Sequence, residues 1–244
     1  MSPVLRNLLA YIETIKTGTR MNQRNYQKEL EKILEGRNKE ITEEKKGSGR
    51  LLLHSCCAPC SSYVLEYLKP YFAITVFYYN PNISRSGEYR KRVEEQKRLI
   101  ALYNQEKAGF PIRILEGDYE PEVFFREAAG LEKEPEGGER CRKCFMLRLE
   151  KTAEEAQKGG YDYFGTTLTI SPLKNAALLN EIGESLALKY QVNWLFSDFK
   201  KKNGYKRSVE LSKEYDLYRQ DYCGCIYSET DRLKYAVKKD LNTD

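Results

Sequence analysis

The sequence predicts an α/β fold, in which helices flank a mostly parallel sheet. Short apolar segments typical of buried strands alternate with longer segments of helical periodicity, with about 30 residues in each strand–helix unit. The length of 244 residues and the hydrophobic content of 41% are enough for one packed core. A Gly-Ser-Gly linker at residues 47–49 predicts a boundary between a helical extension, residues 1–48, and an α/β domain, residues 49–244.

The extension contains two predicted helices, residues 3–16 and 25–36, and the first has apolar side chains at helical spacing. In the domain, three consecutive leucines after Arg50 predict a buried strand, and β-branched and aromatic residues predict a second strand at 74–79. The predicted strands are residues 51–54, 74–79, 112–115, 161–165 and 192–196. The predicted helices of the domain are residues 61–68, 86–104, 121–129, 142–157, 172–189, 208–218 and 228–238.

The net charge of +5 is unevenly distributed, which favours a phosphate-bearing partner. Residues 1–50 carry 11 Lys and Arg against 7 Asp and Glu, a balance that fits a solvated surface equally well. The segment 200–207 is more densely basic, and it contains Tyr205, an aromatic side chain that can stack on a base. We therefore expect nucleic-acid contacts from Lys200, Lys201, Lys202, Tyr205 and Arg207.

The sequence also bears on the cellular compartment. It contains no apolar run long enough to span a bilayer, and its first residues lack the apolar core of a secretory signal. We therefore expect a cytoplasmic protein without a membrane partner. Structural disulfides are rare in that reducing environment, so metal binding or thiol chemistry is the favoured role for its cysteines.

Seven cysteines form three groups, Cys56-Cys57-x-x-Cys60, Cys141-x-x-Cys144 and Cys223-x-Cys225. Such close spacing is typical of metal ligation, iron–sulfur clusters or thiol redox chemistry. The first group follows the first strand of the domain, at the sheet edge where α/β folds bind ligands. The first two groups are also predicted to lie at helix starts, where unpaired N–H groups stabilise thiolates.

Two metals fit these thiols. Zinc takes four sulfur or nitrogen ligands, which Cys56 and Cys57, or Cys57 and Cys60, can supply together with Cys141 and Cys144. An adjacent Cys-Cys pair is awkward for one tetrahedral ion, whereas a 4Fe-4S cluster offers several irons and is favoured. His54 is the only histidine, and we expect it to be a hydrogen-bonded neighbour of the site and not a ligand.

Three further candidates surround this site. Cys223 and Cys225 flank one glycine and can form a strained, easily reduced disulfide, or they can act as spare cluster ligands. Cys60 is an alternative fourth ligand, a ligand of a second metal or a small buried side chain. Asp118 follows the third domain strand and can ligate a hard metal or relay a proton, the alternative being a solvated carboxylate.

These residues resemble the QueH-type epoxyqueuosine reductases. The resemblance covers residues 51–228 and leaves residues 1–50 outside it; the family often has His-Pro after Ile83, where this chain has Ser84-Arg85. It rests on Leu53–Cys60, Tyr79–Ile83, Glu88-Tyr89, Arg140-Cys141-x-x-Cys144 with Arg148-Leu149, Thr166–Leu168 with Ser171-Pro172-x-Lys174, Asp198–Lys201 and Tyr222–Cys225.

The resemblance implies reduction of epoxyqueuosine to queuosine at the wobble position of a tRNA anticodon, without cobalamin and with an unidentified electron donor. It implies a sheet related to that of the PP-loop ATPases, a HUP-like fold, with Cys56–Cys60 in place of the phosphate loop and no use of ATP. On this basis Cys56, Cys57, Cys141 and Cys144 hold the 4Fe-4S cluster. Cys60 or Asp118 holds an additional iron or supplies an acid, and Cys223 and Cys225 pass electrons.

Two other function classes remain open. A zinc-stabilised RNA-binding module without catalysis would use the same thiols as structural ligands. A tRNA-thiolating enzyme would use thiols and ATP, but it requires a glycine-rich phosphate loop with Asp-Ser after the first strand of the domain. The sequence has Ser55–Cys60 at that position instead.

Overall fold

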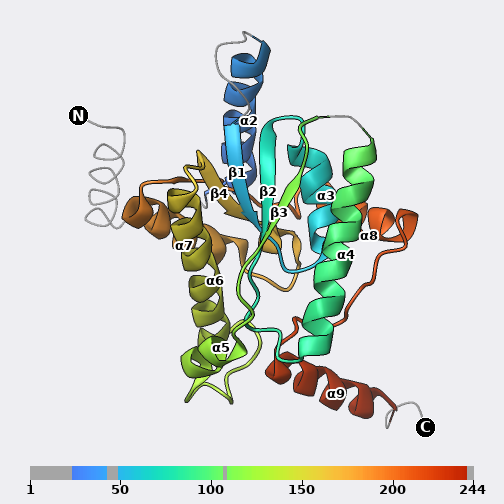
Figure 1. The fold of residues 1–244 in the computed structure, drawn as a ribbon. Coiled ribbons are helices and arrows are strands. Elements are labelled where there is room, and N and C mark those ends of the chain that lie inside the picture. Colours follow the sequence, from blue (N-terminus) through green and yellow to red (C-terminus); the bar gives the residue numbers. More distant parts are fainter. Residues whose placement is uncertain (1–23, 43–48, 107–108, 241–244) are drawn as a thin grey trace.

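The computed structural model describes residues 24–42, 49–106 and 109–240 (Figure 1). The helix predicted at 3–16 lies outside these residues. The helix predicted at 25–36 is confirmed as α2 (Tyr26–Thr42), which continues further than the sequence indicated. None of the helices in the described ranges is long and apolar enough to cross a membrane.

The predicted parallel sheet is confirmed. Its described strands are β1 (Gly49–His54), β2 (Phe72–Tyr78), β3 (Arg113–Glu116), β4 (Tyr163–Thr166) and β5 (Asn193–Trp194). They pair in the order β3-β2-β1-β4-β5, and every pairing is parallel. The chain builds β1 to β3 on one side and then returns to place β4 on the other side of β1. The carboxyl end of β1 therefore lies at the switch point, where sheets of this kind bind ligands.

Helices cover both faces of the sheet (Figure 1). One face carries α3 (Ala58–Leu68), α4 (Ser86–Gln105) and α8 (Gly204–Glu214), and the other carries α6 (Glu139–Lys158) and α7 (Ala176–Tyr190). Near the carboxyl edge lie α5 (Pro121–Ala128) and α9 (Ile226–Asp240).

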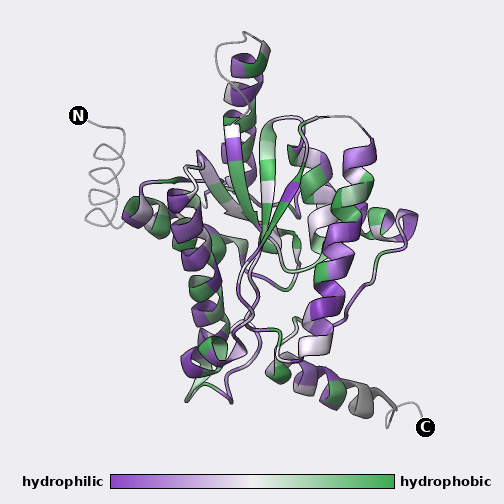
Figure 2. Cartoon of the chain, viewed as in Figure 1, coloured by the Kyte–Doolittle hydropathy of each residue, from purple (hydrophilic) through white to green (hydrophobic). Residues whose placement is uncertain are grey.

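The central strands are apolar on both sides because each side faces a hydrophobic core. Leu51 and Leu53 pack into one core with Leu30 and Leu34 of α2. Leu52 points the other way, into a core that it shares with α6 and α7. Figure 2 shows the strands as mainly hydrophobic and the outer surface of α4 as mainly hydrophilic.

Two helix starts differ from the prediction by four residues, whereas α3 and α6 each begin three residues earlier than predicted. The helix expected from 172 begins at Ala176, because residues 167–170 form a short 3-10 helix and the Asn175 side chain caps α7 by accepting the N–H of Leu178 at 3.2 Å. The helix expected at 208–218 spans Gly204–Glu214 instead. It ends early because Asp216 adopts a left-handed φ of 47° and the N–H of Leu217 returns to the carbonyl of Ser212. Tyr205 and Arg207 therefore belong to the first turn of α8.

Candidate metal centre

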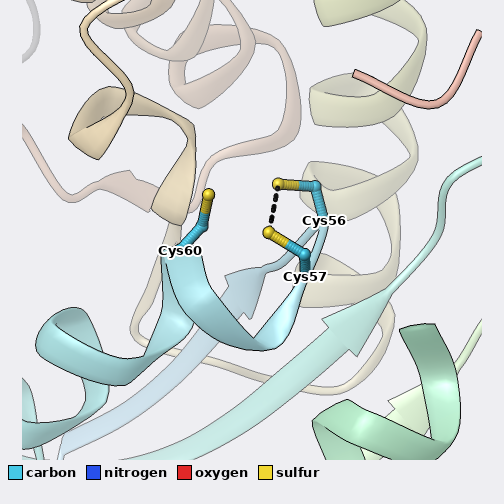
Figure 3. Close-up of side chains that lie close together, drawn as sticks. All are labelled: Cys56, Cys57 and Cys60. Atoms are coloured by element: carbon cyan, nitrogen blue, oxygen red, sulfur yellow. Dashed lines mark hydrogen bonds between the residues drawn. The ribbon is translucent and has the colours of Figure 1, made fainter. Parts of the chain in front are cut away.

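Three thiols converge at the carboxyl end of β1. The sulfur atoms of Cys56, Cys57 and Cys60 all lie within 4.8 Å of one another, and those of Cys56 and Cys57 are 3.7 Å apart. Figure 3 shows the Cys60 sulfur on the same side as this pair. Cys57 is the N-cap of α3 and Pro59 stands in its first turn, so the helix begins at Ala58, three residues before the start predicted at 61.

The protonation states of these thiols fit a metal ligand set. Hydrogen bonds from Cys57 and then Cys60 lower the pKa of Cys56, and the bond to Cys56 raises the pKa of Cys57 to about 12. The pKa of Cys60 is raised as well, first through its bond to Cys56. Without a bound cation, the thiolate of Cys56 is therefore favoured, and deprotonation of Cys57 and Cys60 is opposed. A metal would supply the positive charge that deprotonates the others.

The remaining four cysteines surround a neighbouring cavity of about 90 Å³. Cys141 and Cys144 enter it from the first turns of α6, and Cys223 and Cys225 enter it from the loop before α9. Burial raises the pKa of Cys144 to about 11, while the Gly137 N–H lies 3.3 Å from the Cys141 sulfur. Cys141 and Cys144 do not belong to the three-thiol group, whereas Cys60 does.

Arg148 and Lys174 place positive charge among the cysteine groups. Arg148 is 1% exposed, and its charge acts on Cys144, Cys56 and Cys223. Lys174 lines the cysteine cavity; burial opposes its charge, but the sulfurs of Cys223 and Cys56 raise its pKa overall. These cations compensate the negative charge of thiolates or of an anionic cluster. Sequence reasoning assigned neither residue a role, although Arg148 follows Cys144 by one helical turn and so shares its face.

Arg148 also fixes the state of His54, which is fully buried. Burial, followed by the Arg148 charge, lowers the pKa of His54 to about 3, so the ring is neutral. Arg148 Nε lies 3.2 Å from His54 Nε2, which is also 3.2 Å from the Tyr79 carbonyl oxygen, and His54 Nδ1 lies 3.0 Å from Thr166 Oγ1. His54 is thus a hydrogen-bonded neighbour of the site, as expected.

A network of hydrogen bonds holds the Cys223–Cys225 loop. Arg92 is 1% exposed, pairs with Glu88 at 2.7 Å and donates to the Cys223 carbonyl at 3.1 Å. Asn82 Nδ2 lies 3.7 Å from the Cys223 sulfur. A hydrogen bond from Cys225, then Lys174 and Arg148, lower the pKa of Cys223, which favours a thiolate there.

Replacing Gly224 by alanine is expected to destabilise this loop. Gly224 has a φ of +113°, and an added Cβ would lie 2.9 Å from Ile83 Cγ1. Backbone strain of this kind costs about 1–3 kcal/mol. Urea denaturation should show a loss in that range for Gly224→Ala. Gly87→Ala on α4, where nothing lies within 4 Å, is the control and should not destabilise. Equal stability of the two variants would contradict the assigned strain.

The two acidic candidates differ in position. Asp118 is exposed beyond β3 and lines neither described cavity. Glu136, which sequence reasoning missed, lines the cysteine cavity, and burial followed by Cys223 raises its pKa. No local sequence signal marks Glu136, because it lies in an irregular loop that only the tertiary fold brings to the site.

The predicted basic residues are in different states. Lys201 is exposed and Tyr205 is 40% exposed. Lys200 pairs with Asp198 at 3.0 Å, and Lys202 pairs with Glu31 of α2. Arg207 binds Glu66 of α3 through two hydrogen bonds of 3.1 and 2.7 Å, so its charge already has a partner.

Comparison with known proteins shows which protein family matches this chain. The family model described as epoxyqueuosine reductase QueH matches residues 51–231. Similar proteins named epoxyqueuosine reductase QueH occur in Streptococcus pyogenes, 45% identical over 80% of each chain, and in Staphylococcus epidermidis, 45% identical over 90% of each chain. The protein of that name from Staphylococcus aureus is 43% identical over 84% of this chain and 83% of its own.

Proposed function

Because the chain belongs to the QueH family of epoxyqueuosine reductases, we propose that it reduces epoxyqueuosine to queuosine in tRNA, at the wobble position of the anticodon and in the cytoplasm. The carrying observation is that the matched residues, 51–231, include all three cysteine groups. The reaction removes the epoxide oxygen as water: both of its carbon–oxygen bonds break, a carbon–carbon double bond forms, and two electrons and two protons are consumed.

The proposed cofactor is a 4Fe-4S cluster held by Cys56, Cys57, Cys141 and Cys144 in the domain of residues 49–244. The thiols, buried in Cys57 and Cys144 and partly buried in Cys56 and Cys141, and the cations of Arg148 and Lys174 fit an anionic cluster. When bound, it supplies one-electron transfer and Lewis acidity. Cys60 is the candidate ligand of an additional iron, or an alternative ligand of the cluster, since it groups with Cys56 and Cys57.

Cys223 and Cys225 are the proposed redox pair. Oxidation of the two thiols to a disulfide releases two electrons and two protons, which is the amount that the epoxide consumes. An external electron donor must then reduce the disulfide. Of the acidic candidates, Glu136 is better placed than Asp118 to deliver a proton, because Glu136 lines the cavity that also contains these cysteines.

The tRNA is proposed to contact Lys200, Lys201, Lys202, Tyr205 and Arg207. The exposed Lys201 and Tyr205 support this assignment most directly, as a phosphate contact and a stacking surface. Arg207 would have to exchange its Glu66 partner for a phosphate. The strand order β3-β2-β1-β4-β5, with cysteines after β1, supports the proposed relation to the PP-loop ATPases without ATP use.

Anaerobically purified protein is expected to be brown, to contain iron and sulfide, and to convert epoxyqueuosine in tRNA to queuosine without added cobalamin. Metal and sulfide analysis, together with mass spectrometry of the digested tRNA, measure this. The same protein treated with a chelator and desalted is the control. A colourless zinc protein that binds tRNA and leaves the epoxide intact would instead support the RNA-binding module.

A further inference from the structure

A groove of about 740 Å³ adjoins the cysteine cavity. Its walls are the start of α2 with the residues before it (24–31), the start of α7 with the residues before it (174–177), and the segment after β5 (198–202). Lys174 and Asn175 line both spaces, so a ligand in the groove can reach the cysteines past these two residues. Six of the groove's side chains are basic and two are acidic, so the groove suits a polyanion.

The α2 wall is held firmly against the α/β domain. Arg24 pairs with Glu184 of α7 at 2.7 Å, and its guanidinium lies 4.7 Å from the ring centre of Phe196. The Tyr26 ring stacks on Phe196 at 6.2 Å, and Leu30 is fully buried in the core. These contacts join residues far apart in the sequence, so α2 is a fixed part of the groove.

Two cations on separate walls of the groove are available for a ligand. Lys28 of α2 and Lys201 of the segment after β5 are exposed, and neither forms an ion pair within the described part of the chain. By contrast, the neighbouring Lys202 and Lys200 are paired with Glu31 and Asp198. A phosphate backbone in the groove would therefore meet Lys28 and Lys201 without first displacing a carboxylate.

We propose that this groove binds the phosphate backbone of the anticodon arm, with α2 as one wall and Lys28 as a phosphate contact. The proposal rests on the proposed function and extends it to a helix outside residues 51–231, the part that the family model matches. One strand of the arm lies between Lys28 and Lys201, and the wobble nucleotide enters past Lys174. The positively charged extension then has a role in substrate binding.

The test compares charge reversals at the two ends of one helix. Lys28→Glu is expected to weaken binding of the full chain to epoxyqueuosine-containing tRNA about tenfold at 0.1 M salt, and to make the dependence of log affinity on log salt shallower by about one. Lys201→Glu should behave alike. Lys39→Glu is the control, because Lys39 is exposed on the same helix about 16 Å further along its axis. The affinity of this variant for the tRNA should stay within twofold of that of the unaltered protein.

The outcomes separate this groove from the reductase function. Suppose that the unaltered protein binds the tRNA and reduces its epoxide while Lys28→Glu and Lys39→Glu have equal affinities. That result would contradict the proposal that the groove binds tRNA and leave the proposed reductase function intact. If Lys28→Glu selectively weakens tRNA binding but the unaltered protein does not reduce the epoxide, the proposed reductase function is contradicted and the proposed tRNA-binding groove is supported. In the reductase assay, Lys28→Glu should raise KM and leave kcat nearly unchanged, since Lys28 lies outside the cysteine cavity.

Discussion

Cys141→Ser is expected to lose the iron–sulfur cluster and to lower the reductase rate by more than about a hundredfold. Even residues that only support metal ligands change affinity or activity by about 10–100-fold, so the loss of a thiolate ligand should exceed that range. Iron and sulfide content, visible absorption and single-turnover reduction of epoxyqueuosine tRNA, all measured without oxygen, test this. Circular dichroism should confirm that the variant is folded.

Cys60→Ser is the matched comparison, because Cys60 lies with Cys56 and Cys57 whereas Cys141 lines the neighbouring cavity. With the proposed ligands, Cys60→Ser retains the cluster and loses at most an additional iron. The reverse pattern, a full cluster and full activity in Cys141→Ser with loss of both in Cys60→Ser, would transfer the ligand role to Cys60. The two variants thus decide whether Cys141 or Cys60 is a ligand of the cluster.

Arg148→Met is expected to destabilise the protein by about 3 kcal/mol and to reduce the bound iron. Arg148 donates to His54 Nε2 at 3.2 Å and to Asn80 Oδ1 at 2.6 Å, both in buried side chains. Methionine fills a similar volume but donates nothing, so Asn80 Oδ1 is left without a donor, and a buried acceptor without a partner costs about 1–3 kcal/mol. This loss outweighs the benefit of no longer burying a cation, because the partners remain.

Urea denaturation of the metal-free protein measures this effect. Arg142→Met is the control: Arg142 lies on the same helix, but its side chain is 57% exposed and 3.6 Å from Glu139, so its loss should cost less than about 0.5 kcal/mol. Similar unfolding midpoints for the two variants would contradict the role given to Arg148. Arg148→Lys should rescue little, because one ammonium cannot reproduce the fixed geometry of a guanidinium that spans His54 and Asn80.

Many of the helices and strands could be predicted because they depend on local patterns in the sequence. Periodicity identified the five strands, and Leu51–Leu53 was apolar on both sides because the central strand of a parallel sheet has two cores. The first two cysteine groups were predicted at helix starts, and Cys57 and Cys141 do lie there, at the N-cap of α3 and in the first turn of α6. The start of α8 was missed because residues 200–207 look like a basic loop, and its end was missed because the turn at Asp216 is not visible in the periodicity.

By itself, the sequence determined the α/β class, the three groups of thiols and the position of the first group at the carboxyl edge of the sheet. Only the tertiary structure decided which groups meet: Cys60 with Cys56 and Cys57, Cys141 and Cys144 with Cys223 and Cys225, and the cations of Arg148 and Lys174 among them. Secondary structure follows from local periodicity and capping. The position of a charge inside a site depends on how distant segments pack and on which side chains lose water together.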